Sequence, residues 1–131
     1  MTIRKMQLRH FTVFEELDIE FSEGINVLIG DNGTGKTHVM KLIYSAYQAA
    51  KPHVSFSQKV VNTFRPDDFK IGRLVNRKRG TSSATVKVIA KKDETTKHIG
   101  IKFSTKTKKW DAEVTAEESW EQAFKENEST F

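Results

Sequence analysis

Apolar and polar residues alternate along the first part of the chain. In residues 2–9 and 12–22 the alternation has a period of about two, which is typical of strands with one buried face. A turn at Ser22, Glu23 and Gly24 follows, and the apolar run at residues 25–29 then predicts a fully buried strand. We therefore expect two strands joined by a short turn, followed by an internal strand.

The apolar spacing changes after residue 35. Apolar residues now recur every three or four positions, at Val39, Leu42, Ile43, Ala46 and Tyr47. This spacing predicts a helix over residues 36–50 with that face on the sheet, and Pro52 ends it.

The second half predicts a hairpin and a short helix. Residues 62–68 are expected to form a loop, with a turn at Pro66, Asp67 and Asp68. Residues 85–90 and 99–104 alternate as strands around a long polar connection, residues 91–97. Their inward-facing residues would be Val86, Val88, Ile99, Ile101 and Phe103.

The C-terminal segment predicts a short amphipathic helix over residues 116–126. Thr115 and Glu118 have the spacing of a capping box, in which each side chain bonds a free backbone N–H at the helix start. Trp120 and Phe124 stand four residues apart and are expected to be core anchors.

A complete phosphate-binding motif, G-x-x-x-x-G-K-[ST], stands between the predicted buried strand and the first predicted helix. Gly30, Gly33 and Gly35 let successive backbone N–H groups turn towards a polyphosphate. Lys36 would reach the β- and γ-phosphates, and the Thr37 hydroxyl would coordinate Mg²⁺. An ordinary glycine-rich turn would explain the glycines but not Lys36 and Thr37 on the first helical turn.

Composition bounds the remaining possibilities. The chain has 131 residues, enough for one domain or part of one, and no apolar run reaches the roughly 18 residues of a membrane span. With no signal-peptide pattern either, we expect a cytoplasmic protein. The absence of cysteine excludes disulfides and thiolate metal sites. The four histidines, His10, His38, His53 and His98, show no metal-ligand spacing.

The positive charge is concentrated in the middle of the chain. Residues 51–110 contain sixteen Lys and Arg against four Asp and Glu, a net charge of +12, whereas residues 111–131 carry −6. Two basic groups stand out: Arg73, Arg77, Lys78 and Arg79, and then Lys102, Lys106, Lys108 and Lys109. The segment at residues 70–109 could contact DNA phosphates, or it could be the solvated face of a hairpin. Aromatic residues are sparse among these cations, so the sequence does not indicate a base-stacking surface.

The loop and its flanks resemble the SMC and RecF-like branch of ABC-class ATPases. The resemblance lies in G-x-N-G-T-G-K-T, in Leu8-Arg9-His10-Phe11, which is similar to an "L-x-N-F" turn, and in Phe21-x-x-Gly24-Ile25-Asn26. It implies an α/β fold: a P-loop NTPase N-terminal lobe with a mixed, largely antiparallel β-subdomain and few helices. It also implies an ATP-binding head that dimerises around ATP and acts on DNA in repair, chromosome maintenance or phage defence. The implied ATP-binding residues are Gly30, Asn32, Gly33, Thr34, Gly35, Lys36 and Thr37, with Thr37 on Mg²⁺ and Asn32 towards the dimer partner.

The sequence departs from this pattern at three places. His10 replaces the usual Asn, and Thr12 follows Phe11 where many members have an Arg near the nucleotide. No apolar run ends directly in Asp-Glu, and no Ser-Gly-Gly signature is present, so the catalytic carboxylate is unknown. We interpret residues 1–131 as one N-terminal lobe of a longer ATPase, with residues 1–50 forming the strands, loop and helix, and residues 51–131 the hairpin region and last helix.

Two other functions remain open from sequence alone. The loop would also suit a P-loop kinase or GTPase, although no guanine-reading N-K-x-D is present. A nucleic-acid-binding module with a purely structural loop would account for the basic middle segment.

Overall fold

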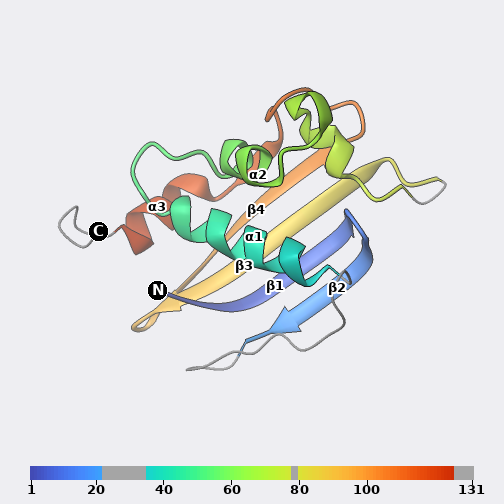
Figure 1. Ribbon diagram of the computed structural model, residues 1–131. Helices are drawn as coiled ribbons and strands as arrows, with labels where there is room; N and C mark the ends of the chain where they lie inside the picture. The colour runs from blue at the N-terminus through green and yellow to red at the C-terminus, as the bar shows by residue number, and fades with distance from the viewer. Residues whose placement is uncertain (22–34, 78–79, 126–131) are drawn as a thin grey trace.

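A five-stranded antiparallel sheet forms the centre of the molecule (Figure 1). The computed structural model describes residues 1–21, 35–77 and 80–125. The strands are β1 (Thr2–Phe11), β2 (Phe14–Glu20), β3 (Ser83–Lys92), β4 (Thr95–Ser104) and β5 (Glu113–Thr115), in the order β2-β1-β3-β4-β5. β1 therefore pairs on one side with β2, its neighbour in sequence, and on the other with β3, more than seventy residues away.

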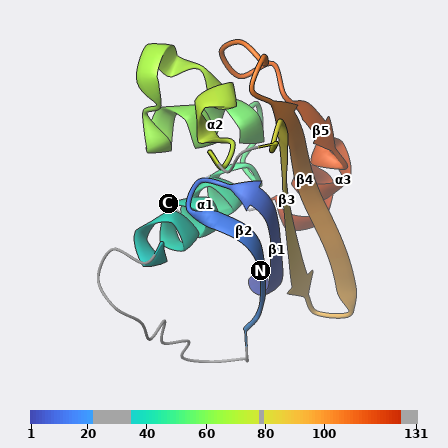
Figure 2. The ribbon, with the colours of Figure 1, turned by 90° about the vertical axis from the view of Figure 1, so that its right-hand side faces the viewer.

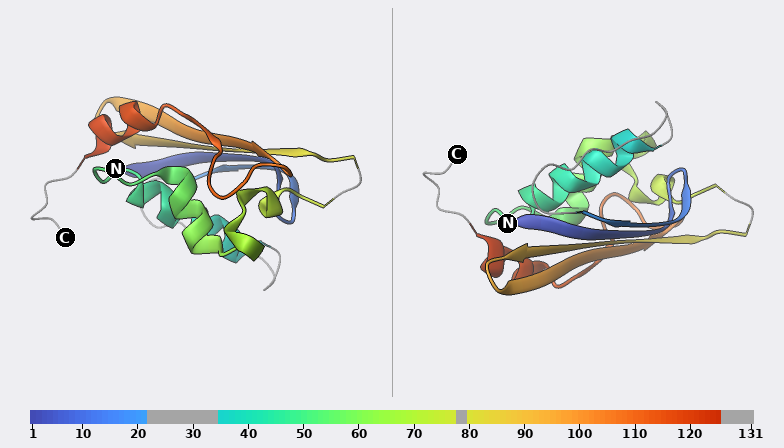
Figure 3. Two further views of the ribbon diagram at one scale, coloured as in Figure 1. Left: turned by 90° about the horizontal axis from the view of Figure 1, so that it is seen from above. Right: turned by 90° about the horizontal axis from the view of Figure 1, so that it is seen from below.

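The long helices cover one face of this sheet. Helices α1 (Lys36–Gln48) and α2 (Phe56–Phe64) lie together on that face, as Figures 2 and 3 show from the side and from above and below. Two short 3₁₀ turns, η1 (Asp67–Phe69) and η2 (Ile71–Leu74), lead from α2 back towards β3. Among the described residues, no helix is long and apolar enough to cross a membrane.

The last helix, α3 (Glu117–Phe124), contacts strand β4 and is hydrogen-bonded to both α1 and α2. Its Trp120 is fully buried, packs edge-on against Phe124 with ring centroids 4.8 Å apart, and donates from Nε1 to the carbonyl oxygen of Ala46 at 3.1 Å. The carboxylate of Glu117 accepts a hydrogen bond from the backbone N–H of Phe56, at the start of α2, at 2.8 Å. The predicted core anchors Trp120 and Phe124 are therefore confirmed.

The core lies between the sheet and the helices. Every second side chain of the strands points into it. All the inward-facing residues predicted for the hairpin are buried, as are Ile3, Met6, Leu8 and Phe11 of β1. The opposite face of the sheet is polar, and there Arg9 bonds Asp18 at 2.9 Å. One apolar and one solvated face is the usual arrangement of an antiparallel sheet.

In the first half of the chain, the structure agrees closely with the sequence predictions. The strand pair, its turn and the helix after residue 35 are confirmed, and Val39, Leu42 and Ala46 are buried. Tyr47 was expected on the same face but is 40% exposed, because the helix turns it towards the N-terminus, where its hydroxyl meets the carbonyl of Met1 at 3.4 Å. The α/β class is confirmed. All pairs of described strands are antiparallel, and the predicted strand at residues 25–29 lies outside the described residues.

Three predictions for the second half were wrong. Residues 62–64 belong to α2, which Ser55 caps through Gln58 N and which ends at Arg65, in the left-handed region, before Pro66. The expected long connection at residues 91–97 is a two-residue turn, because the ladder of β3 and β4 continues up to Lys92 and Thr95.

The third error concerns the start of α3. Its N-cap residue is Ala116, with φ of 62° and no side-chain hydrogen bond, so Thr115 and Glu118 form no capping box. Thr115 instead ends β5 and pairs with Gly100, which fixes its backbone in the sheet.

Candidate functional site

Helix α1 begins with the last three residues of the phosphate-binding motif. Gly35 is its N-cap residue, with φ of 91°, and Lys36 and Thr37 occupy the exposed first turn. Among the described residues, no side chain caps this end, and the first turn contains no acidic residue. The free N–H groups and the positive end of the helix dipole therefore remain available to an anion.

The turn between β1 and β2 packs directly against this helix start. A Cβ placed on Gly35 would lie 2.7 Å from Cε1 of Phe14 and 3.0 Å from Cγ2 of Val13. A side chain there would collide with both residues, and the positive φ is also unfavourable for any residue with a Cβ. Glycine at this position thus allows the start of α1 to pack closely against the β1–β2 turn.

Hydrogen bonds hold the same turn to two distant segments. The Thr12 hydroxyl lies 2.7 Å from Nδ1 of His38, on the first turn of α1. The Thr12 backbone donates to the carbonyl of Leu74 at 2.7 Å, and the Asn76 side chain donates to the Thr12 carbonyl at 2.9 Å. The turn is therefore fixed between α1 and the segment that follows η2.

His10 takes part in this arrangement through its backbone. Its φ is 53°, in a region where Asn and His are enriched among residues other than glycine. Its carbonyl oxygen accepts a hydrogen bond from Asn76 N at 2.7 Å. The replacement of the expected Asn by His therefore leaves the turn conformation accessible.

An open cleft of about 520 Å³ lies beside the start of α1. It is lined by Thr12, Val13, His38, Arg73, Leu74, Val75, Asn76 and Arg77. Arg77 is exposed, whereas Arg73 has a carboxylate partner, since its Nη2 lies 3.8 Å from Oδ2 of Asp68. Two arginines, Arg73 and Arg77, therefore line the same cleft as Thr12.

The environment of His38 favours its neutral form. Burial, and to a lesser extent the nearby Lys41, lowers the pKa of His38 below its ordinary value of 6.5. The unfolded chain then binds a proton more readily than the folded chain. Any stability that depends on neutral His38 is complete above pH 6.5 and is lost as the pH falls through the lowered pKa.

We expect the free energy of unfolding to decrease from pH 7.5 to pH 5.5 by more in the wild type than in His38→Gln. Glutamine keeps a hydrogen-bonding group opposite Thr12 but does not titrate. Urea unfolding at the two pH values measures the difference. Identical pH dependence in both proteins would show that His38 contributes nothing to it.

The predicted ATP-binding residues divide into two groups. Gly35, Lys36 and Thr37 come together at the start of α1, as expected. Gly30, Asn32, Gly33 and Thr34 lie outside the described residues. Sequence reasoning missed the link between Thr12, His38 and Asn76, because no motif relates these three residues. Their contact depends on a bridge between Phe11 and Val75, which are far apart in the chain.

A family model described as "AAA domain" matches residues 5–130. The chain belongs to the AAA domain family. DNA replication and repair protein RecF of Streptococcus suis (strain 05ZYH33) is 32% identical over 80 residues, covering 61% of this chain and 22% of that protein. RecF of Clostridium botulinum (strain Eklund 17B / Type B) is 34% identical over 90 residues, covering 68% of this chain and 24% of that protein. The chain thus spans about a quarter of the length of these relatives.

These comparisons confirm the resemblance drawn from the motif and its flanks. The AAA domain chain is a distant homologue of the N-terminal part of RecF, an SMC-like ATPase. Membership of an ATPase family implies nucleotide binding, and it favours an ATPase over the kinase or GTPase alternative.

The basic residues of segment 70–109 lie on several elements of this AAA domain chain. Arg77 lines the cleft beside α1, whereas Lys87 and Lys102 are exposed on strands β3 and β4. Lys106, Lys108 and Lys109 are exposed in the loop before β5. Lys78 and Arg79 lie outside the described residues. The exposed cations of residues 70–109 therefore lie on several different elements of the fold.

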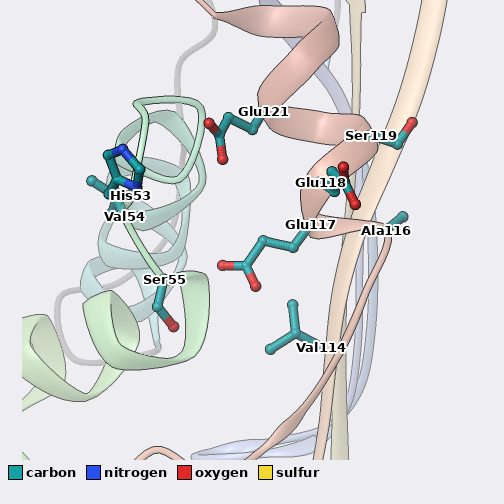
Figure 4. Close-up of a pocket in the computed structure, with 9 residues that line it drawn as sticks. All are labelled: His53, Val54, Ser55, Val114, Ala116, Glu117, Glu118, Ser119 and Glu121. Carbon is teal, nitrogen blue, oxygen red and sulfur yellow. The ribbon is translucent and has the colours of Figure 1, made fainter.

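A second hollow, of about 750 Å³, lies between the start of α2 and helix α3 (Figure 4). Glu117, Glu118 and Glu121 line one side of it, and His53 and Ser55 the other. Glu117 is already bonded to Phe56 N, and no group of His, Asp or Glu among the described residues is placed to hold a metal ion. We interpret this hollow as the junction of the two helices.

Proposed function

We propose that this chain binds Mg-ATP at the start of α1, as a lobe of an ATPase head that acts on DNA. The main support for this proposal is the N-terminus of α1, which has no side-chain cap among the described residues. There Gly35, Lys36 and Thr37 complete the phosphate-binding motif. A helix end without a side-chain cap or an acidic residue has donors that only water or a ligand can satisfy.

The residues present suit a magnesium-bound triphosphate. The Lys36 ammonium would hold the β- and γ-phosphates, and the exposed Thr37 hydroxyl would be a Mg²⁺ ligand. The cation would neutralise charge on the phosphate oxygens. Gly30, Asn32, Gly33 and Thr34 would complete the cradle with their backbone groups, with Asn32 towards a dimer partner.

Arg77 lines the cleft beside the start of α1. Many members of the SMC and RecF-like branch have an arginine after the Phe of the β1–β2 turn, whereas this chain has Thr12 bonded to His38. Because Arg77 and Thr12 line one cleft, we propose that Arg77 supplies the missing positive charge near the nucleotide.

The relatives support the proposed setting of the lobe. The SMC-like branch places the loop in a head of two lobes that dimerises around ATP, and the matched relatives are named DNA replication and repair proteins. We propose the same setting here, in the cytoplasm, with residues 1–131 as one lobe and DNA contacted through exposed cations of residues 70–109.

Magnesium dependence tests this proposal. A fluorescent ATP analogue is titrated against the wild type, Thr37→Ala and Thr37→Ser, with and without Mg²⁺, and is then displaced by ATP or GTP. We expect Mg²⁺ to tighten binding in the wild type and in Thr37→Ser, and this gain to fall at least about tenfold in Thr37→Ala, which corresponds to ~1.4 kcal/mol. Equal Mg²⁺ dependence in all three proteins, or displacement by GTP alone, would contradict the proposal.

A further inference from the structure

A group of aromatic and basic side chains, all exposed except the half-buried Lys70, lies where η1 and η2 meet the loop between β4 and β5. We call it the aromatic–basic platform, and its residues are Phe69, Lys70, Lys106, Lys108, Lys109 and Trp110. Phe69 is 54% exposed and Trp110 is 36% exposed, so the core accounts for neither ring. Figures 1 and 2 show the two segments side by side at the same end of the sheet.

Backbone contacts hold these two segments together. The N–H of Ile71 donates to the carbonyl of Lys109 at 2.7 Å, and the N–H of Gly72 donates to the carbonyl of Thr107 at 3.3 Å. A Cβ on Gly72 would lie 2.7 Å from the carbonyl oxygen of Thr105, so only glycine permits this approach. Phe69 and Trp110 therefore flank a fixed joint.

The backbone beside both rings is strained. Asp68, Phe69 and Lys109 have φ values of 60°, 49° and 48°, in the left-handed region that residues with a Cβ rarely adopt. Backbone strain of this kind is found more often at functional sites than elsewhere.

Positive charge surrounds the rings. The cations of the two segments are Arg65, Lys70, Arg73, Lys106, Lys108 and Lys109, and the carboxylates are Asp67, Asp68 and Asp111. Asp68 faces Arg73 at 3.8 Å, so these two charges largely offset each other. The remaining cations still outnumber the carboxylates, and the three lysines that precede Trp110 in the loop, Lys106, Lys108 and Lys109, are all exposed.

We propose that the aromatic–basic platform binds single-stranded nucleic acid, with bases stacked on Trp110 and Phe69 and phosphates held by the neighbouring lysines. Unpaired bases offer open ring faces to aromatic side chains, whereas a duplex keeps those faces stacked inside. A partner held by charge alone would need the lysines but not the two rings. The proposal deepens the DNA-directed part of the proposed function and rests on that part, not on ATP binding.

The two tryptophans of the chain provide the test. Trp120 is fully buried and Trp110 is exposed, so a ligand that quenches tryptophan emission without unfolding the chain reports on Trp110. The chain is titrated, without nucleotide, with dye-labelled oligothymidylate of about 12 nucleotides, within the site size usual for single-strand binders. A duplex of the same length is the comparison, and dye anisotropy gives the affinity for every variant.

We expect oligothymidylate to bind more tightly than duplex and to quench Trp110. Trp110→Ala should weaken binding about tenfold, whereas Trp110→Phe, which keeps a stacking ring, should stay within about twofold of the wild type. Lys106→Ala with Lys108→Ala should weaken binding and reduce its salt dependence. The matched control is Lys92→Ala with Lys97→Ala, which removes the same charge at the opposite end of the β3–β4 hairpin.

Three results would overturn the proposal. The first is an oligothymidylate affinity that Trp110→Ala leaves unchanged in a variant whose thermal unfolding matches the wild type. The second is duplex binding as tight as single-strand binding, which would leave the DNA-directed part of the proposed function standing. The third is the absence of binding to either form, which would overturn that part as well.

Discussion

Trp120→Ala is expected to lower the free energy of unfolding by about 3–5 kcal/mol, the range observed when a large buried aromatic residue is truncated. Trp120 is fully buried against Phe124, and its Nε1 bonds the carbonyl oxygen of Ala46 in α1. Alanine would leave a cavity between α3 and α1 and an unpaired carbonyl beside it.

Urea unfolding followed by far-ultraviolet circular dichroism measures this change. Trp110→Ala is the matched control, because it removes the same side chain from a position that is 36% exposed. We expect the control to change the free energy of unfolding by less than about 1 kcal/mol. If the two variants were equally destabilised, α3 would not be fastened to α1 as described.

Gly35→Ala is expected to destabilise the chain by about 2–5 kcal/mol and to weaken Mg-ATP binding. The left-handed backbone alone costs roughly 1–2 kcal/mol with a Cβ, and forcing a methyl group into packed surroundings adds about 1–3 kcal/mol. The Cβ would meet Phe14 and Val13, so either the turn or the first residues of α1 must move.

Gly80→Ala separates these two contributions. Gly80 has φ of 88°, close to the 91° of Gly35, but a Cβ there would have no atom of the described residues within 4 Å. It should therefore show the conformational cost without the collision, and urea unfolding of both variants gives the difference. A Gly35→Ala variant as stable as Gly80→Ala would mean that the β1–β2 turn does not press against α1.

The spacing of apolar residues predicted correctly those elements that have a clear periodicity or that pair with a neighbour in sequence. Val39, Leu42 and Ala46 define the buried face of α1, and Trp120 and Phe124 define that of α3. The resemblance to SMC and RecF-like proteins was also readable, because the motif and its flanks are contiguous.

The wrong or missing predictions concern features that depend on contacts between segments, which the local sequence pattern does not show. The ladder between β3 and β4 carries Lys91 and Thr96 into paired strand positions despite their polarity. The cleft beside α1 depends on Phe11 meeting Val75, and the aromatic–basic platform on Ile71 meeting Lys109. Exposed aromatic residues that are far apart in the chain thus come together with lysines, although aromatic residues are sparse within the basic segment itself.

Calorimetric titration with Mg-ATP tests the central claim, a phosphate site at the start of α1, most directly. The wild type is compared with Lys36→Ala and with Lys41→Ala, which removes the same charge from the same helix beside the ring of Phe64. We predict saturable binding in the wild type and in Lys41→Ala, and binding at least about tenfold weaker in Lys36→Ala, a difference of ~1.4 kcal/mol. Indistinguishable titrations of the wild type and Lys36→Ala would contradict the account.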